Sequence, residues 1–266
     1  MDLGLEGQVA IVTGGNRGIG KAVARQLARE GVDVAIAARD MVAAEVACAE
    51  ISKETGRRVK AFKVDTGDDA AVRAMVAAVA AEFGRIDILV NNAAQPGGQK
   101  SPPTLAEITD EAFFSDMNVK VMGYIRCARE VAPHMRKQGG GRIINISGLA
   151  ARGTGNIIGS VRNIGVAAVS KNLADELSPH GILVNCVHPK LTRTEKTPEV
   201  AERMAKNLGI TAAEAEKRMG SSSLIGRLIT SEEVADVVVF LASPRAVAVN
   251  GDTITAGGGA KGVIYY

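Results

Sequence analysis

The sequence predicts an α/β fold in which a doubly wound parallel sheet of about seven strands carries helices on both faces. Two observations support this prediction: short apolar segments alternate with longer amphipathic segments along nearly the whole chain, and no change of composition divides it. Strict alternation of strands and helices produces parallel strands joined by right-handed crossovers. With 266 residues and no linker-like stretch, residues 1–266 are expected to form a single domain.

The strands are expected where short runs of aliphatic residues interrupt the amphipathic pattern. The predicted strands are 8–13, 33–38, 59–64, 86–91, 142–147, 182–187 and 252–256. The helices are expected where apolar residues recur every three or four positions, as Val23, Ala24 and Leu27 do after the first strand. The predicted helices are 18–30, 41–55, 68–83, 110–137, 156–178 and 231–242.

Several helix boundaries carry residues that favour the beginning or the end of a helix. Asp68 precedes the third helix as an N-cap, and Gly84 follows its last turn. Pro179 and Gly181 end the fifth helix. The segment Thr230-Ser231-Glu232-Glu233 has the spacing of a capping box before the last helix. These residues support the boundaries that the periodicity predicts.

A glycine-patterned turn, Thr13-Gly14-Gly15-Asn16-Arg17-Gly18-Ile19-Gly20, joins the first strand to the first helix. A helix whose first turn lacks side chains can bring its N–H groups close to a pyrophosphate. Glycines alone would indicate only a tight turn. The apolar strand before them and the amphipathic helix behind them favour a dinucleotide-binding turn.

Two stretches lie outside the alternation of strands and helices. Residues 95–104 are rich in Gly and Pro and follow the fourth strand, and residues 192–228 contain two short helical patterns, 198–207 and 211–219. Ligands of open α/β sheets bind beyond the carboxyl ends of the strands. We therefore interpret 95–104 as a rim of the site and 192–228 as a substrate lid, with simple surface loops as the alternative.

Composition and charge argue against several functions. The net charge of +3, from 32 basic and 29 acidic interspersed residues, is too balanced for a nucleic-acid-binding surface. The longest apolar run, 237–242, is far too short to span a membrane. Cys48, Cys127 and Cys186 lack paired or metal-ligand spacing, which indicates buried thiols and no metal site. No signal peptide is evident, so we expect a cytoplasmic protein without nucleic-acid or membrane partners.

Taken in order, the motifs resemble those of the short-chain dehydrogenase/reductase family from about Leu5 to Gly259. Thr13-Gly14 with Gly18 and Gly20 matches the family's Thr-Gly-x-x-x-Gly-x-Gly turn. Further counterparts are Asp65, Asn91-Asn92-Ala93-Ala94, Asn118, Ser147, Val184 to Pro189, Gly226-Arg227 and Gly257-Gly258. Several motifs in one order are far more specific than any single motif. The resemblance implies a Rossmann-type fold and a nicotinamide cofactor.

The resemblance, together with the charges considered next, also indicates which residues hold the cofactor. They are Gly14, Asn16, Arg17, Gly18, Ile19, Gly20, Arg39, Asp65, Thr66, Asn91, Ala93, Pro189 and Thr194. In the family, the counterpart of Asp65 bonds the adenine amino group.

The end of the second strand bears on the choice between NAD(H) and NADP(H). An acid at this position accepts hydrogen bonds from the ribose hydroxyls and repels a 2′-phosphate. The chain has Ala38 at the position of that acid, followed by Arg39, and Arg17 projects from the glycine turn toward the same corner. Two guanidinium groups favour a phosphate, so NADP(H) is expected over NAD(H). In the alternative interpretation, Asp40 binds the ribose and Arg39 faces solvent.

The family's Tyr-x-x-x-Lys pair, which transfers the proton and holds the nicotinamide ribose, is absent from this sequence. The end of the fifth helix sets a register in which Gly159 stands at the tyrosine position and Asn163 at the lysine position. A second register, through Ser170-Lys171, would put Ala167 at the tyrosine position. The proton donor is missing in both registers.

The catalytic residues that the resemblance then implies are Asn118, Ser147 and Asn163. Ser147 is expected to bond the substrate oxygen, although the substrate-contacting position can instead be Gly148. Asn118 would position a water relay. Asn163 can hydrogen-bond a ribose hydroxyl but brings no positive charge.

Three further residues could compensate for the missing pair. Lys190 follows Pro189 near the expected nicotinamide end and could supply the lost charge, or it points into solvent. His188 could be an acid–base group, or it is a core histidine on an apolar strand. Arg162 could bind an acidic substrate, or it is a charge on the helix surface.

Two functions are therefore weighed. The first is an NADP(H)-dependent oxidoreductase that acts on a small carbonyl or hydroxyl compound with a non-standard active site. The second is a catalytically inactive NADP(H)-binding protein, such as a sensor or scaffold subunit. A lyase-like or dehalogenase-like activity is a weaker third. Because relatives pair the helices 110–137 and 156–178 between subunits, a homodimer or homotetramer is expected.

Overall fold

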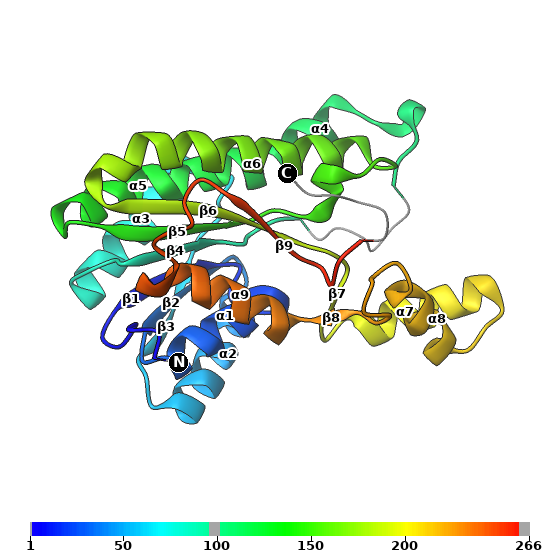
Figure 1. Ribbon diagram of the computed structural model, residues 1–266, viewed down its shortest axis with the longest axis horizontal. Coiled ribbons are helices and arrows are strands. Elements are labelled where there is room, and N and C mark those ends of the chain that lie inside the picture. Colours follow the sequence, from blue (N-terminus) through cyan, green and yellow to red (C-terminus); the bar gives the residue numbers. More distant parts are fainter. Residues whose placement is uncertain (1, 96–101, 261–266) are drawn as a thin grey trace.

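The computed structural model describes residues 2–95 and 102–260, and its described residues form three layers (Figure 1). A seven-stranded parallel sheet in the order β3-β2-β1-β4-β5-β6-β9 lies in the middle. The helices α1, α2 and α9 cover one face, and α3, α5 and α6 cover the other. The predicted single-domain, doubly wound α/β architecture is therefore the observed one.

The strands agree closely with the prediction. They are β1 (Val9–Thr13), β2 (Asp33–Ala38), β3 (Val59–Lys63), β4 (Ile88–Asn91), β5 (Gly141–Ile146), β6 (Ile182–Pro189) and β9 (Thr253–Ala256). The helices are α1 (Gly18–Arg29), α2 (Met41–Thr55), α3 (Asp69–Phe83), α4 (Asp110–Met117), α5 (Gly123–Lys137), α6 (Ile157–Leu177), α7 (Thr197–Leu208), α8 (Ala212–Gly220) and α9 (Ser231–Ala242).

The first strand is the point at which the strand order reverses. Val12 of β1 is paired with Ile36 of β2 on one side and with Val90 of β4 on the other. The crossovers after β1 and after β3 therefore leave in opposite directions along the sheet. Ligands of open α/β sheets bind at the carboxyl ends of the strands beside such a point.

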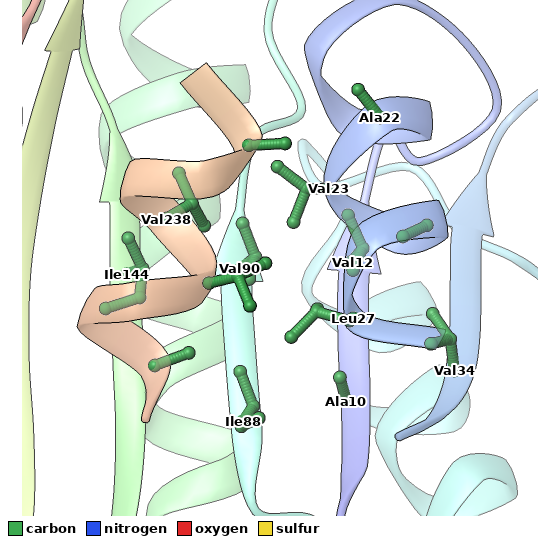
Figure 2. Close-up of a cluster of buried hydrophobic side chains, with 14 of the residues drawn as sticks. Ala10, Val12, Ala22, Val23, Leu27, Val34, Ile88, Val90, Ile144 and Val238 are labelled. Carbon is green, nitrogen blue, oxygen red and sulfur yellow. The ribbon is translucent and has the colours of Figure 1, made fainter. Parts of the chain in front are cut away.

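The hydrophobic core has two halves, one on each face of the sheet. Ala10 and Val12 of β1 pack toward α1 and α9, whereas Ile11 between them packs toward α3 and α5. Figure 2 shows the first half, with Leu27 of α1 and Val238 of α9 beside the β1 and β4 side chains. Strands that are buried on both faces read as continuous apolar runs, which explains why the sequence located them well.

The expected caps are present at several helix ends. The Asp68 carboxylate accepts a hydrogen bond from Ala71 N at 3.1 Å, and Gly84 ends α3 with a positive φ of 79°. At α9, Thr230 Oγ1 accepts from Glu233 N while the Glu233 carboxylate accepts from Thr230 N. This reciprocal pair is the capping box that the sequence predicts.

The segment 110–137, predicted as one helix, contains a π-helical turn at Asn118–Met122 between α4 and α5. Side chains satisfy two carbonyl groups of this wide turn. Arg126 Nη1 donates to Asn118 O at 3.1 Å, and Thr66 Oγ1 donates to Val119 O at 3.0 Å. Single π turns inside helices occur frequently at functional sites. The interruption has a direct consequence for the residues of the site.

The segment 192–228 forms a separate lobe beyond the carboxyl ends of the strands (Figure 1). Its helices α7 and α8 pack through the buried side chains of Ala201, Ala205 and Ala215. Two short parallel strands, β7 (Thr192–Arg193) and β8 (Ile229–Thr230), join the base of this lobe, and the sequence did not predict them. Of the predicted rim 95–104, residues 96–101 lie outside the described residues. Within 2–95 and 102–260, no helix combines the length and apolarity needed to cross a membrane.

Candidate active site

A cleft of about 730 Å³ lies at the carboxyl ends of the strands. It is bounded by residues that directly follow β1, β2, β3, β4, β5 and β6. One end reaches Arg39, after β2, and the other reaches Ser147, after β5. Residues of the predicted lid, among them Thr194, Thr197 and Met219, form part of its wall.

The glycine turn after β1 forms the floor of the cleft. Gly14 and Gly18 have positive φ values of 64° and 54°, a backbone conformation that residues other than glycine rarely adopt. A Cβ at Gly20 would collide with Gly14 O, so only glycine lets α1 begin this close to the turn. Thr13 Oγ1 accepts hydrogen bonds from Asn92 N at 2.9 Å and from Ala93 N at 3.0 Å. The ends of β1 and β4 are thereby fixed together.

The N-terminus of α1 already holds a negatively charged group. Gly18 N donates to the Glu195 carboxylate, at 3.1 Å from Oε1 and 3.2 Å from Oε2. The first N–H groups of a helix have no partner within the helix and attract anions. The Glu195 carboxylate therefore occupies a position suited to a phosphate. Together with the glycine floor, this arrangement fits the pyrophosphate of a dinucleotide cofactor.

The end of the cleft near β2 is positively charged. Arg17 and Arg39 both line it and are exposed. Among the ion pairs within the described ranges, none involves Arg17 or Arg39. The Asp40 carboxylate, the alternative ribose ligand, caps α2 by accepting from Ala43 N at 3.1 Å. Asp65 also lines the cleft, where its carboxylate accepts from Gly67 N at 2.9 Å.

The other predicted cofactor residues mostly border the same space. Those that line the cleft are Gly14, Asn16, Ile19, Thr66, Ala93, Pro189 and Thr194. Gly18 borders an adjoining pocket, and Gly20 supports the turn from behind.

Asn91 is placed differently from the prediction. Its side chain is fully buried, and Nδ2 donates to Asn145 Oδ1 at 2.9 Å. The side chain at the last position of β4 points into the interior between β4 and β5. Asn92, one residue later, lines the cleft and donates to Thr13 O at 3.1 Å.

The opposite end of the cleft contains a buried polar cluster formed by Ser147, Asn163 and Lys120. Ser147 Oγ donates to Asn163 O at 2.9 Å, with Asn163 Oδ1 at 3.4 Å. Lys120 Nζ donates to Ser147 O at 3.0 Å and to Asn163 Oδ1 at 3.1 Å. All three residues line the cleft. The predicted Ser147 and Asn163 are thus brought together, with a lysine that the sequence analysis did not identify.

Lys120 is nearly inaccessible to solvent, with 4% of its surface exposed. Burial, together with the nearby charge of Arg162, lowers the pKa of its ammonium group to about 7, while Asp116 acts in the opposite direction. One sequence signal could have identified it: Lys120 lies between Val119 and Val121 in an amphipathic helix, where a solvent-facing charge is not expected.

Asn118, predicted as a catalytic residue, lies outside this cluster. Its Nδ2 donates to Gly67 O at 3.1 Å, and its Oδ1 accepts from Arg126 Nη2 at 2.7 Å. Successive residues of a helix point about 100° apart, so positions 118 and 120 face nearly opposite directions. Because Lys120 faces Ser147, the Asn118 side chain is directed away from Ser147. The role of Asn118 in a water relay stays a prediction.

The two registers considered for α6 differ in what they place at the cleft. Gly159 and Asn163 line it, and the Asn156 side chain caps α6 at Gly159 N at 2.8 Å. Lys171 instead is exposed and pairs with Asp175. The geometry therefore favours the first register.

The three compensating residues all have other partners. Lys190 donates to Ser222 O in the predicted lid. His188 is buried, its Nδ1 accepts from Gly148 N at 3.3 Å, and burial lowers its pKa to about 4, so it is neutral at pH 7. Arg162 donates to both carboxylate oxygens of Asp116 at 2.8 Å.

The described tyrosine is also unsuited to proton transfer in the cleft. Tyr124 is fully buried and donates from Oη to Ile146 O at 2.9 Å. Burial raises the pKa of its phenol well above the ordinary value. Tyr265 and Tyr266 lie outside the described residues. In the described part of the chain, no cluster of acidic, histidine or cysteine side chains could hold a metal ion.

Comparisons with known proteins match the chain along nearly its whole length. The sequence model of the family described as enoyl-(acyl carrier protein) reductase matches residues 14–261. Short-chain reductase protein NovJ of Streptomyces niveus is 38% identical over 252 residues, which are 94% of this chain and 93% of NovJ. The 3-oxoacyl-[acyl-carrier-protein] reductase FabG of Escherichia coli is 31% identical over 269 residues, covering 97% of this chain and 98% of FabG.

A solved structure agrees in fold over the same length. L-sorbose reductase from Gluconobacter frateurii, crystallised with NADPH and L-sorbose, superimposes with a TM-score of 0.93 at 32% identity. The match covers 99% of this chain and 100% of that protein.

Proposed function

The chain belongs to the short-chain dehydrogenase/reductase family, and we propose that it is an NADP(H)-dependent oxidoreductase of small carbonyl or hydroxyl compounds with a non-standard active site. One observation carries the proposal: a single cleft runs from the guanidinium groups of Arg17 and Arg39 to the hydroxyl group of Ser147. A cofactor phosphate at one end and a reacting carbonyl group at the other can therefore occupy the same cavity.

The charges near β2 favour NADP(H) over NAD(H). A 2′-phosphate between Arg17 and Arg39 would accept charge-assisted hydrogen bonds from both side chains. No carboxylate occupies the position of Ala38, and Asp40 is engaged as the cap of α2. The crystal structure of L-sorbose reductase from Gluconobacter frateurii contains NADPH, which is consistent with this preference.

The chain's own residues would bind and orient the reactants. The N-terminus of α1 would hold the pyrophosphate, and Asn163 would hydrogen-bond the nicotinamide ribose. When bound, the cofactor would supply or accept a hydride. Because Ser147 Oγ donates its proton to Asn163 O, its lone pairs remain able to accept a hydrogen bond from a substrate hydroxyl. Rotation of the same hydroxyl would let it donate to a substrate carbonyl.

A catalytically inactive NADP(H)-binding protein is the alternative function. The observation that favours it is the environment of Tyr124, whose phenol is buried and bonded to Ile146 O rather than directed into the cleft. In this case the cleft would bind the cofactor, and the chain would act as a sensor or scaffold subunit.

The decisive experiment has two stages. NADPH and NADH are titrated separately by nucleotide fluorescence, and tighter binding of NADPH is expected. The oxidation of NADPH is then followed at 340 nm with a panel of aldehydes, ketones and quinones. Tight binding without turnover across the panel would favour the inactive alternative, and absence of binding to both nucleotides would defeat both functions.

Ser147→Ala tests whether turnover uses the proposed site. Removal of one hydrogen-bond donor to a developing oxyanion typically lowers kcat by about 10²–10³-fold, and we expect a loss of this order. NADPH affinity should change little, because Ser147 lies at the opposite end of the cleft from Arg39. Ser160→Ala is a matched control, since Ser160 donates to Gly153 O outside the cluster.

We also propose that the protein is a homodimer or homotetramer whose subunits meet through α4 and α6. Phe114 of α4 and Ile164 of α6 are 65% and 53% exposed, and Val161 of α6 is also exposed.

A further inference from the structure

We infer that Lys120 is the catalytic acid of this site: its ammonium group gives the proton to the substrate oxygen during carbonyl reduction. This inference rests on the proposed function, because it assigns the proton donor of the same reaction. The argument starts from the position of Lys120 in the cleft and from the hydrogen bonds that hold it there.

The side chain of Lys120 is held in a defined position. Its Nζ donates to Ser147 O at 3.0 Å and to Asn163 Oδ1 at 3.1 Å. An ammonium group has three N–H donors, so two are used and one remains. Lys120 lines the cleft together with Ser147, whose hydroxyl is the proposed contact of the substrate oxygen. Within the described residues this third N–H has no partner, and the inference assigns it to the substrate oxygen that Ser147 contacts.

The groups around Lys120 determine its protonation. Arg162 of α6 lowers the pKa of Lys120, and its partner Asp116 of α4 raises it to a smaller extent. Burial is the larger cause, and it brings the pKa to about 7. An acid whose pKa lies near neutral pH is well matched to proton transfer at that pH.

The remaining ionisable neighbours are neutral at pH 7. Burial raises the pKa of the Cys186 thiol of β6 to about 11 and lowers that of His188 to about 4. The Tyr124 phenol of α5 also keeps its proton, because burial raises its pKa. Lys120 is thus the group of this cluster that changes protonation state near neutral pH.

The proposed step balances in atoms and charge. A hydride from the reduced nicotinamide cofactor forms the new C–H bond at the carbonyl carbon, and the C=O π pair moves to oxygen. This oxygen forms an O–H bond with a proton of the Lys120 ammonium group as the N–H bond breaks. The products are the alcohol, the oxidised cofactor and a neutral amine, which takes a proton from water before the next turnover.

The first test measures the protonation of Lys120 without cofactor or substrate. Protein labelled with ¹³C at lysine Cε is titrated by NMR, and one lysine resonance is expected to titrate near pH 7. This resonance should be absent from Lys120→Met and present in Lys171→Met, a matched change of an exposed lysine on α6. If Lys120→Met does not fold, Lys120→Arg makes the assignment. A Lys120 resonance that titrates as an ordinary lysine overturns the inference.

The second test measures turnover. Reduction requires the protonated amine, so wild-type kcat should fall as pH rises through about 7. Loss of a positioned acid typically costs about 10²–10⁴-fold in kcat, and Lys120→Met should lose that much and also the pH dependence. Its affinity for NADPH should fall far less than its kcat, because Lys120 contacts Asn163 but lies away from Arg17 and Arg39. Lys120→Arg, which stays charged but does not release its proton, should not restore kcat.

The two proposals fail in different ways. Wild-type turnover with an undiminished kcat in Lys120→Met would overturn the role of Lys120 and leave the proposed function intact. Absence of wild-type turnover with every carbonyl compound would overturn the oxidoreductase function, and the role of Lys120 with it.

Discussion

The Glu195 carboxylate accepts a hydrogen bond from the backbone N–H of Gly18, with both oxygens within 3.2 Å of the nitrogen. Gly18 is the first residue of α1, and Glu195 belongs to the segment that carries α7 and α8. A carboxylate of the predicted lid thus occupies the helix N-terminus at which a cofactor pyrophosphate is expected. The two anions would compete for the same N–H groups.

Glu195→Gln should therefore strengthen NADP(H) binding. Anions at an exposed helix N-terminus typically gain 0.3–1 kcal/mol, which corresponds to an increase in affinity of about 2–5-fold when the competitor is neutralised. Isothermal titration of NADPH measures the change. Glu202→Gln is the control. Glu202 is an exposed residue of α7 that does not contact Gly18, so this substitution should leave the NADPH affinity unchanged. Weaker binding by Glu195→Gln would mean that Glu195 assists the cofactor instead.

Arg39→Asp should reverse the preference between the two cofactors. The substitution removes a charge-assisted bond to the 2′-phosphate, worth about 1.5–3 kcal/mol, so NADPH affinity should fall by about 10–100-fold. The new carboxylate can accept bonds from both ribose hydroxyls, so NADH affinity should rise. Parallel fluorescence titrations with the two nucleotides measure the ratio.

Lys53→Asp makes the same change of charge on the exposed face of α2, away from the cleft. It should leave the preference unaltered. A wild-type protein that binds NADPH and NADH equally would contradict the role assigned to Arg17 and Arg39.

Acidification should destabilise the protein through His188. Its pKa is about 4 in the folded state, against an ordinary value of 6.5. Between these values the unfolded chain binds a proton that the folded chain does not, so stability is lost as pH falls from 6.5 to 4. At 1.36 kcal/mol per pKa unit, the loss is on the order of 3 kcal/mol. Urea unfolding at pH 7 and at pH 4.5 measures it.

His188→Gln removes the titrating group and should show a correspondingly smaller difference between the two pH values. Each variant is compared with itself, so any constant loss of packing cancels. An equal dependence on pH in both proteins would show that other groups control acid unfolding.

Ile164→Glu should dissociate the proposed oligomer. Ile164 is 53% exposed on α6, and burial of a charge without a partner opposes association. Light scattering after gel filtration should give a dimer or tetramer for the wild type and a smaller species for the variant. Val42→Glu alters a similarly exposed residue on α2 and should not change the mass. A monomeric wild type would refute the proposal.

The sequence predicted the sheet well because its strands are buried on both faces. Ile11 and Val12 pack on opposite sides of β1, so the run has to be apolar throughout. The sequence failed at two-residue strands such as Thr192–Arg193, which have no periodicity to detect. Their pairing with Ile229–Thr230 depends on contacts between distant segments.

The candidate site was predicted in part. Ser147 was found by its motif and Asn163 by the register of its helix, and the structure brings them together. Lys120 was missed because its place in the site depends on contacts with Ser147 and Asn163, which lie 27 and 43 residues further along the chain. The π turn at Asn118–Met122 was also not predicted, because contacts of Thr66 and Arg126 with its carbonyl groups help to stabilise it.

The paired strands β7 and β8 have a mechanical consequence for the lobe that they join. Thr192 is aligned with Ile229, and Arg193 with Thr230, so the chain enters and leaves the lobe through one short ladder. Helices α7 and α8 are also packed against each other, and independent displacement of either would break that packing. A displacement of one helix would therefore carry the other with it, and it would strain the hydrogen bonds of Ser223 and Leu224 to Gly258. Admission of a reactant and departure of a product would then share one opening motion and one rate.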